Sequence, residues 1–479
     1  MADENEFFRP VGEICQREIV SCPPIDSVRD VANTMRSKNI SSVVVVDRGQ
    51  PLGIVTDRDL RNKVVATGEN PASIQVTQIM SRPLSVVRED DGLYGALYRM
   101  ARERIHRLGV VDRVGQLVGI ITDTDILRAQ TRSPHGMILD IERAESVNEL
   151  GALHRRVQDL TVRLMDVGVP VREVVKLVAR LNDLVLIRLI DLLRAEKYPD
   201  LPNGFAFVVM GSEGRGEQTL STDQDNAVIW NDTLSGEQVQ QIKAFAEDLI
   251  DALISIGVPP CPGGNMAKNE PWQRSLSEWR GELRRWFSEG RPEDIVTGGM
   301  AIDLRTLYGD SSLEAAIKSD VYGYAQEYPN FIVQMARNVA RYSPPLGWFG
   351  RIKAEKKGDL RGKVDLKKAG IFVITDGVKA LALEAGNLDG GTHDRIESLS
   401  AAGVMGQREA EDLQASFDVL LLLRLWAQSK DLGKCRDPTN YVVLNSLNSI
   451  QRGELRLAME AVARFQNVLV HRYNLQQTG

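Results

Sequence analysis

Short apolar runs and helical patterns alternate along most of this 479-residue chain. The runs 205–210 (FAFVVM) and 227–230 (AVIW) are uninterrupted and bounded by polar turns, which predicts two buried strands. From about residue 320 onward the patterns are helical, with FDVLLLLRLWAQ and LRLAMEAVARFQNVLV as the strongest segments. The hydrophobic pattern therefore predicts an α+β protein of several domains that ends in a helical bundle over 320–475.

An internal repeat organises the first third of the chain. The segment GQPLGIVTDRDL, from Gly49 to Leu60, recurs as GQLVGIITDTDI, from Gly115 to Ile126. Each copy follows an apolar run, and a helical pattern precedes that run. A strand–helix–strand–strand–helix unit that occurs twice can bury the sheet of one copy against its twin. The repeat therefore predicts a two-copy module over about 8–132.

The segment 136–198 lies between the repeat and the two predicted strands, and its apolar spacing is helical with a break near Gly168 and Pro170. We expect a helical spacer that joins the repeat to the following core, with His154 on a solvated face. Farther along, Trp279 and Trp286 are seven residues apart, which places both on one helix face and predicts a core role.

Candidate chemistry lies between the two predicted strands. A glycine-rich turn, GSEGRG over 211–216, follows the first strand, and Asp223 and Asp225 precede the second. If these aspartates begin that strand, both carboxylates point to one face. Two adjacent carboxylates repel each other without a cation, and Mg²⁺ takes oxygen ligands together with substrate phosphates. Small residues and backbone N–H groups in the turn can hold a triphosphate. The combination predicts a metal-dependent nucleotide site, and the alternative is a tight loop with solvent-facing acids.

Composition and charge narrow the class of protein. The chain is 43% hydrophobic and 26% charged, as is ordinary for a soluble globular protein. Its formal net charge of −6 argues against a protein that coats nucleic acid. The four cysteines, Cys15, Cys22, Cys261 and Cys435, have no metal-type spacing and are expected to be reduced thiols. The N-terminus has no apolar signal core, and no apolar run approaches the ~20 residues that span a bilayer. We expect a cytoplasmic protein with no membrane or nucleic-acid partner.

The turn and the acids resemble the DNA polymerase β-type nucleotidyltransferase superfamily, in particular the branch of PII uridylyltransferase and glutamine synthetase adenylyltransferase. Those enzymes carry a Gly-Ser turn, an Arg-Gly-Glu element and Ser/Thr-Asp-x-Asp, which match Gly211, Ser212, Arg215, Gly216, Glu217, Thr222, Asp223 and Asp225. Asn226 is a departure, because a hydrophobic residue more commonly follows the second aspartate. The resemblance implies a polymerase β-like core over 199–318. It further implies transfer of an NMP group from ATP or UTP to a hydroxyl of a protein or small molecule.

The resemblance also implies residue roles. Asp223 and Asp225 would hold Mg²⁺ (or Mn²⁺), and Asp303 in GGMAIDLRTLYGD would be the third carboxylate. Gly211 and Ser212 would bind the triphosphate, Arg215 would steady its charge, and Glu217 would hold the loop. Lys367, in a short Asp-x-Lys segment, would approach the phosphates. Two residues of a segment shared with such fusions, Asn265 and Lys268, would line the pocket. The helical region over 320–475 would bind substrate.

The repeat resembles a tandem pair of cystathionine β-synthase (CBS) domains, a Bateman module. In that family the Gly-φ-x-Thr-x-x-Asp signature holds an adenine nucleotide, which implies ligand contacts at Thr56 and Asp59 in the first copy and at Thr122 and Asp125 in the second. The alternative is that Thr and Asp only cap the following helix. Such modules usually pair, so we expect a homodimer. The overall hypothesis is a nucleotidyltransferase regulated by an adenine nucleotide. Two alternatives remain: a catalytically silent nucleotide-sensing scaffold, and a module that only dimerises the enzyme.

Overall fold

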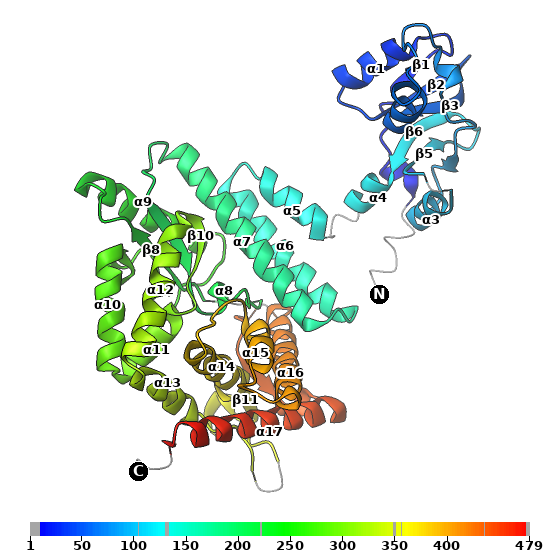
Figure 1. Cartoon of the computed structure of the whole chain (residues 1–479). Coiled ribbons are helices and arrows are strands. Elements are labelled where there is room, and N and C mark those ends of the chain that lie inside the picture. Colours follow the sequence, from blue (N-terminus) through cyan, green and yellow to red (C-terminus); the bar gives the residue numbers. More distant parts are fainter. Residues whose placement is uncertain are drawn as a thin grey trace. The chain divides into compact units, whose positions relative to one another are not determined.

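The computed structural model describes residues 10–103, 105–129, 134–220, 223–347, 351–355, 357–434 and 436–475. The chain divides into two compact units, Met1–Gly136 and Met137–Gly479, which are described separately (Figure 1). Cys15, Cys22 and Cys261 are free thiols, and Cys435 lies outside the described residues. Of the helices in the described ranges, none has both the length and the apolar character that crossing a membrane requires.

The first unit consists of two matching copies, which confirms the repeat (Figure 1). The first copy contains β1 (Ser21–Cys22), α1 (Val28–Ser37), β2 (Ser42–Asp47), β3 (Gln50–Thr56) and α2 (Asp57–Leu60). The second contains β4 (Val86–Arg88), α3 (Leu93–Glu103), β5 (Arg107–Val111), β6 (Leu117–Thr122) and α4 (Asp123–Ala129). In each copy the first strand pairs parallel with the second, and the second pairs antiparallel with the third. Each copy has its own hydrophobic core.

A helical pair begins the second unit. It follows α5 (Pro134–Arg143) and consists of α6 (Val147–Asp166) and α7 (Val171–Glu196). The break falls at Gly168, whose φ of +79° a residue with a Cβ rarely adopts. Leu150, Val157 and other buried residues of this pair belong to the same hydrophobic core as the central strands. The predicted spacer is therefore an integral part of the second unit.

A four-stranded sheet forms the centre of the second unit, with the strand order β10-β7-β8-β9. Its strands are β7 (Phe205–Val209), β8 (Asn226–Trp230), β9 (Gln273–Ser275) and β10 (Arg305–Gly309). The two predicted strands are confirmed within one residue at each end. They pair antiparallel, with Val209 opposite Asn226, and β10 pairs antiparallel with the other edge of β7.

Helices cover both faces of this sheet, because alternate residues of its strands point to opposite sides. Phe207 and Val228 pack with α7 and α9 (Gly236–Ser255), whereas Val208 and Ala227 pack with the helices that follow β9. Those helices are α10 (Leu276–Glu289), α11 (Pro292–Ala301) and α12 (Ser311–Glu327). Trp279 and Trp286 are buried with ring centroids 6.2 Å apart, which confirms their predicted core role.

The C-terminal part is helical, as predicted, and comprises α13 (Asn330–Ala340), α14 (Phe372–Glu384), α15 (Thr392–Ala401), α16 (Gln407–Leu432) and α17 (Ser449–Arg472). The pattern did not predict one small antiparallel sheet, formed by β11 (Lys363–Asp365) and β12 (Tyr441–Val443). Leu420 and Phe465 share a core with the helices that precede the sheet, so the second unit folds as one body.

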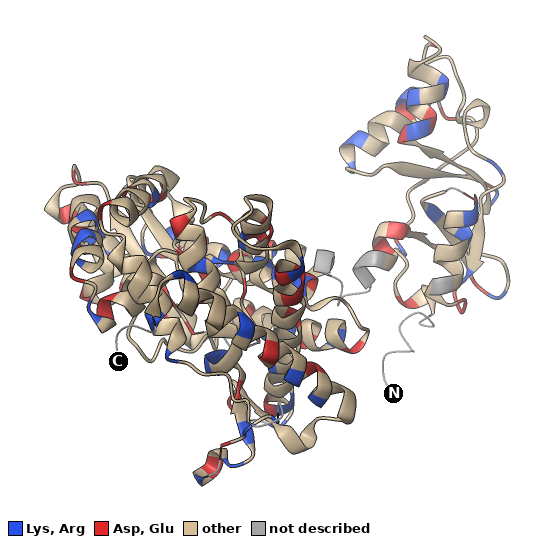
Figure 2. Ribbon diagram, turned by 60° about the horizontal axis from the view of Figure 1, so that its bottom comes forward, with Lys and Arg blue, Asp and Glu red and all other residues tan. Residues whose placement is uncertain are grey.

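Charged residues of both signs are interspersed along the helices of the two units (Figure 2). Lys and Arg number 59 and Asp and Glu number 65, so the net charge of −6 is a small difference between two mixed populations.

Candidate active site

The glycine-rich turn and the second aspartate lie against each other. After β7, the Met210 N–H donates to the Asp225 carbonyl oxygen at 2.8 Å, and the short helix α8 (Gly211–Gly214) begins. Gly211 has a φ of +57°, and a Cβ there would lie 3.1 Å from Asp225 Oδ2. A larger residue would strain the backbone and crowd the carboxylate. The expected juxtaposition of turn and acid is therefore present, while Thr222 lies outside the described residues.

Asp225 lies immediately before β8 and is mostly buried. Burial raises the pKa of its carboxyl, and the negative charge of Asp223 raises it further. Contacts with Cys261 and Asn265 and the charge of Lys367 act in the opposite direction. The two predicted aspartates are thus close enough to interact unfavourably. Asn265, a predicted pocket residue, lies beside them, whereas Lys268 pairs with Asp251 on the surface at 3.0 Å.

The C-terminal helical region brings positive charge to this pair. Lys367, directly after β11, places its Nζ 3.6 Å from Asp223 Oδ2, so its predicted approach to the site is matched by the geometry. Arg424 of α16 is buried, and burial lowers its pKa to about 10 although the charges of Asp223 and Asp365 raise it. Arg424 was not predicted. Its only signal in the sequence is a single charge within the apolar run LLLLRLW.

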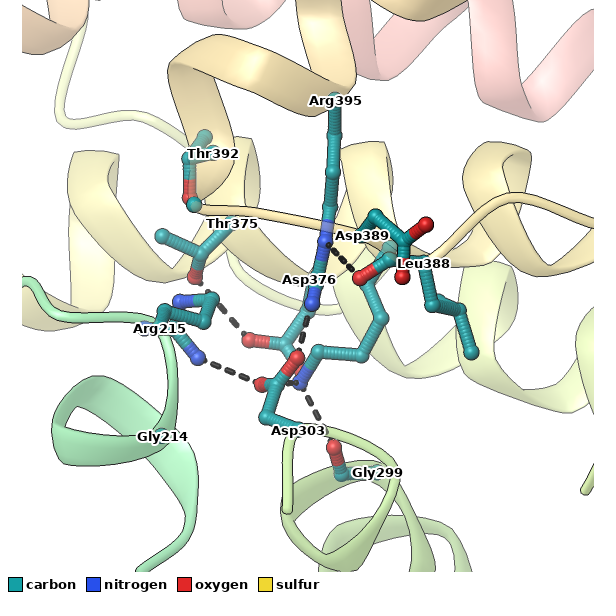
Figure 3. Close-up of polar contacts among 12 residues, drawn as sticks. Gly214, Arg215, Gly299, Asp303, Thr375, Asp376, Leu388, Asp389, Thr392 and Arg395 are labelled. Carbon is teal, nitrogen blue, oxygen red and sulfur yellow. Dashed lines mark hydrogen bonds and ion pairs between the residues drawn. The ribbon is translucent and has the colours of Figure 1, made fainter. Parts of the chain in front are cut away.

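Asp303 has a different environment from the one predicted. Its side chain has no exposed surface, and its oxygens lie 2.6 Å from Arg215 Nη1, 2.7 Å from Lys379 Nζ and 2.7 Å from Arg395 Nη1 (Figure 3). Burial alone would raise the pKa of this carboxyl, but the three cations hold it well below its usual range. Within the described ranges, no group of three or more His, Cys, Asp or Glu residues is placed to hold a metal ion. The structure therefore does not assemble the predicted three-carboxylate group.

The cluster around Asp303 joins the glycine-rich turn to the C-terminal helices. Arg215 also binds Glu217 at 2.7 Å, and Glu217 accepts the backbone N–H of Thr392 at the start of α15. Lys379 of α14 donates to the Gly299 carbonyl oxygen at 2.6 Å (Figure 3). Glu217 thus holds the loop, in the geometry that its predicted role requires. Arg215 is buried among carboxylates, with its Nε on Glu217 and its Nη1 on Asp303, and its predicted contact with a triphosphate stays a prediction.

The turn contains another acid, Glu213, that the sequence reading did not assign. Glu213 is buried, and burial together with the charges of Asp183 and Asp225 raises its pKa to about 8. Arg305 partly offsets this effect and pairs with Asp183 at 2.9 Å. Glu213 is therefore largely protonated at pH 7 and can donate a hydrogen bond. In the sequence, the feature that could have pointed to Glu213 is its position between Gly211 and Gly214 of the turn.

A cavity of about 640 Å³ adjoins the site and lies among α6, α7, the turn, the end of α9 and the loop that follows it. Asp223 and Glu213 are part of its lining, so the cavity and the candidate site are contiguous. His154 also lines it, and burial lowers the pKa of this imidazole to about 4, with the charge of Arg155 as a smaller cause. His154 is half-buried and faces this cavity, so it lies on a less solvated face of α6 than expected.

In the first unit, both signature pairs form helix caps. Thr56 N–H and Oγ1 donate to Asp59 Oδ2 at 3.0 and 2.6 Å, and Asp59 Oδ1 pairs with Lys63 at 2.8 Å. In the second copy, Thr122 donates in the same way to Asp125 Oδ2. Each Thr-Asp pair therefore caps the helix that follows it, and the predicted contact with a nucleotide stays a prediction.

The two copies differ in what holds the remaining carboxylate oxygen. The Gln16 amide donates to Asp125 Oδ1 at 3.2 Å, whereas a cation holds Asp59. Arg107 lies near the signatures of both copies: burial lowers its pKa, and the charges of Asp57, Asp123, Asp125 and Asp59 raise it. A neutral partner is easier to displace than a charged one, so Asp125 is the more available of the two aspartates.

Comparison with known proteins shows which families the parts of this chain belong to. Residues 155–293 match the family described as "Putative nucleotidyltransferase DUF294", and 329–473 match the "Putative nucleotidyltransferase substrate binding domain". Residues 11–66 and 76–132 each match the CBS domain. The chain belongs to the DUF294 family and carries a tandem CBS pair. The predicted order of CBS pair, nucleotidyltransferase core and C-terminal helical domain is confirmed.

Individual relatives match only part of this DUF294 protein. An uncharacterized protein of Methanopyrus kandleri, MK0525, is 40% identical over 25% of this chain and 62% of its own length. Another from Methanocaldococcus jannaschii, MJ1232, is 30% identical over 25% of this chain and 38% of its own length. The uncharacterized protein YlbB of Bacillus subtilis is 32% identical over 29% of this chain and 95% of its own. The first two alignments thus span less than two thirds of those relatives.

The solved structures that resemble this chain cover a similar fraction of it. An uncharacterized conserved protein from Pyrococcus horikoshii is 28% identical over 26% of this chain and 96% of its own, with a TM-score of 0.25. The CBS domain pair of MJ0100, solved with 5′-methylthioadenosine and S-adenosyl-L-methionine, is 27% identical over 25% of this chain and 93% of its own, with a TM-score of 0.23.

The environment of Asp303 makes a stability prediction. Asp303→Asn removes the negative charge that three buried cations share, and breaking a buried pair of this kind typically costs about 3–5 kcal/mol. We expect a loss of that size in the free energy of unfolding, measured by urea denaturation. Asp412→Asn is the control, because its pair with Arg464 is exposed and should contribute less than about 1 kcal/mol. Equal effects of the two changes would contradict this account of the cluster.

Glu213 predicts a pH dependence. Its pKa is raised from 4.5 to about 8 in the folded protein, so the folded state keeps a proton that the unfolded state releases between these values. Glu213 therefore lowers the free energy of unfolding as pH rises from about 4.5 to about 8, by at most roughly 1.4 kcal/mol per pH unit. Glu213→Gln removes this titration, so the variant should gain stability relative to the parent with rising pH. Urea denaturation at pH 5, 6.5 and 8 measures the difference, and a constant difference would refute the assignment.

Proposed function

We propose that the second unit transfers an NMP group from a nucleoside triphosphate to an acceptor hydroxyl. The observation that carries the proposal is the meeting of the turn, the acids and a lysine: Gly211 lies against Asp225, and Lys367 lies 3.6 Å from Asp223. In the reaction, a bond forms between the acceptor oxygen and the α-phosphorus, and the bond to pyrophosphate breaks. The acceptor proton leaves to a base or to solvent. The acceptor is a protein or small-molecule hydroxyl.

The acids present fit Mg²⁺ or Mn²⁺. Carboxylate oxygens are the ligands that these hard cations prefer, and the raised pKa of Asp225 marks a negative charge that burial and Asp223 make costly. A bound cation would relieve that cost. When bound, the metal ion would neutralise charge on the phosphates and orient them for attack. Asp223 and Asp225 would hold it, and Asp303 would not, since three cations already engage its oxygens.

The remaining residues of the site have separable roles in this proposal. Gly211 and Ser212 lie where the turn leaves β7 and would lie along the triphosphate, since small residues permit close approach of the backbone. Lys367 would contact phosphate oxygens as a compact positive charge. Protonated Glu213 adds no negative charge at neutral pH, which keeps the repulsion at Asp225 from growing. Arg215 and Glu217 act indirectly, by fixing the turn.

We further propose that the first unit binds an adenine nucleotide and regulates the second. The support is the approach of both Thr-Asp signatures to Arg107, whose positive charge suits a phosphate. Of the two aspartates, Asp125 can exchange the Gln16 amide for a ribose hydroxyl at smaller cost. Regulation requires that the nucleotide bind one functional state of the whole chain more tightly than another. Pairing of two modules in a homodimer is part of this proposal.

A catalytically silent nucleotide-binding scaffold is the second candidate. The observation in its favour is the engagement of Asp303, which leaves two carboxylates where active members of the superfamily use three. Incubation with labelled ATP or UTP, Mg²⁺ and cell extract separates the two candidates. Transfer of label to a macromolecule or a small molecule supports the enzyme, and nucleotide binding without transfer supports the scaffold.

The metal-binding acids are tested by substitution. Asp223→Asn or Asp225→Asn removes one oxygen charge from the proposed metal site, so Mg²⁺-dependent nucleotidyl transfer should fall by at least about a hundredfold. Both variants should fold, because neither acid is paired with several buried cations as Asp303 is. Asp251→Asn, a surface acid paired with Lys268, is the control and should retain full activity. A near-normal rate in either site variant would exclude the assignment.

The regulatory site is tested by calorimetry with AMP, ADP and ATP. Asp125→Ala should weaken the tightest of these nucleotides by about ten- to a hundredfold, because a carboxylate that pairs with a ribose diol contributes about 1–3 kcal/mol. The control is Asp90→Ala, a half-exposed acid beside Arg113. Asp59→Ala should have a smaller effect on affinity than Asp125→Ala. Unchanged binding in both signature variants would place the nucleotide elsewhere.

A further inference from the structure

Five amide side chains line the cavity beside Asp223, and in three of them only one of the two polar atoms of the amide has a hydrogen-bond partner among the described residues. Asn182 Nδ2 donates to Gln218 Oε1 at 3.2 Å, and Gln224 Nε2 donates to the Val258 carbonyl oxygen at 3.0 Å. Asn226 Oδ1 accepts the Ala267 N–H at 2.7 Å. Backbone partners fix the orientation of Gln224 and Asn226. Gln218 fixes Asn182, because the Gln218 side chain also hydrogen-bonds the Glu213 carboxyl.

The other polar atom of each of these three amides is buried and has no hydrogen-bond partner among the described residues. These atoms are Asn182 Oδ1, Gln224 Oε1 and Asn226 Nδ2. Leaving a buried donor or acceptor unsatisfied is costly, so three such atoms around one cavity indicate a ligand that supplies their partners. The set consists of two acceptors and one donor. The complementary ligand therefore offers N–H groups and a ring or carbonyl acceptor.

Apart from Asp223 and Glu213 at the candidate site, the inner lining of the cavity carries no charge, which favours an uncharged ligand group there. Val157, Val178, Leu186 and Ile256 are apolar walls, and His154 is neutral above pH 5 because burial lowers its pKa to about 4. The charged residues Arg155, Arg436 and Asp437 of the lining are exposed at its edge. A volume of about 640 Å³ lies within the roughly 300–1,000 Å³ of pockets that hold small molecules. A nucleobase has the size, shape and hydrogen-bonding groups required.

We propose that this cavity binds the base of the nucleoside triphosphate and selects a base with an exocyclic amino group. The amino N–H groups would donate to Asn182 Oδ1 and Gln224 Oε1, and a ring nitrogen next to the amino group would accept from Asn226 Nδ2. Adenine, cytosine and guanine have this arrangement. Uracil and hypoxanthine have no amino group, and the single N–H of their pairing edge can donate to only one of the two acceptors. The inference rests on the proposed function and makes ATP, CTP or GTP the substrate in preference to UTP.

The matched pairs adenosine with inosine, guanosine with inosine and cytidine with uridine test this inference, since the members of each pair differ at the amino group. In calorimetry on the full chain, the Kd of adenosine, guanosine or cytidine should be at least about tenfold lower than the Kd of its counterpart without an amino group, since that counterpart leaves a buried acceptor unpaired. The tightest binder of the three identifies the base. Equal or tighter binding of inosine and uridine, or no binding of any nucleoside at millimolar concentration, would overturn the proposal.

Variants locate the preference in the cavity. Asn182→Leu and Gln224→Met each remove one acceptor with little change of volume, so each should bring the adenosine-to-inosine ratio several-fold closer to one. Gln407→Ala changes an exposed amide at the start of α16 and should keep the ratio of the parent. Thermal melting checks that each variant is folded, and the comparison of nucleosides on the parent protein stands if one is not. A ratio that stays unchanged in both cavity variants would overturn the placement.

These outcomes separate the base pocket from the chemistry. Nucleoside binding requires no transfer, so a clear amino preference without any nucleotidyl transfer retains the pocket and removes the transferase. Transfer that uses UTP as well as ATP, without an amino preference in binding, retains the transferase and removes the pocket.

Discussion

The buried carboxylate of Asp303 is the constraint on which the second unit depends. An isolated buried charge costs several kcal/mol, and here Arg215, Lys379 and Arg395 compensate it from the glycine-rich turn, α14 and α15. These elements are far apart in the sequence, so the compensation exists only when the core and the C-terminal helices are assembled. Once it is made, Arg215 and Glu217 are fixed, and with them the turn that presents Gly211 to Asp225. The C-terminal helical region is therefore part of the frame of the site.

The features that the sequence predicted well are those that a local pattern determines. Strands β7 and β8 are buried on both faces, so their residues are continuously apolar and stand out from the turns that bound them. The CBS repeat was visible because the same segment recurs. The approach of Gly211 to Asp225 follows from an antiparallel pair whose ends meet, with Val209 opposite Asn226. Lys367 was found through a short motif, although its distance from Asp223 depends on the pairing of β11 with β12.

The features that the sequence did not reveal depend on partners distant along the chain. The pattern around Asp303 indicates a carboxylate near the start of a strand, but its partner Arg395 is 92 residues away, and nothing local distinguishes a metal ligand from an ion-paired acid. Asn182 lies on a long helix among leucines, and its unsatisfied oxygen is evident only when Gln218 and the cavity are in place. His154 illustrates the same limit, since the cavity that it lines exists only when α6, α7 and the turn are assembled.

The two kinds of carboxylate near the turn differ in what a cation would do to them. Drawing Asp303 to a metal ion would leave three buried cations without their shared anion, a loss that one metal bond would not offset. Asp223 lies 3.6 Å from Lys367 and interacts with the charge of Arg424, and burial makes ionisation of Asp225 unfavourable, so a cation between these two acids would lower the energy of both. Asp303 thus belongs to the frame, and Asp223 and Asp225 are the pair that we propose for metal binding. Whether nearby cations already neutralise an acid therefore determines whether that acid can bind a metal ion, and its place in the sequence does not.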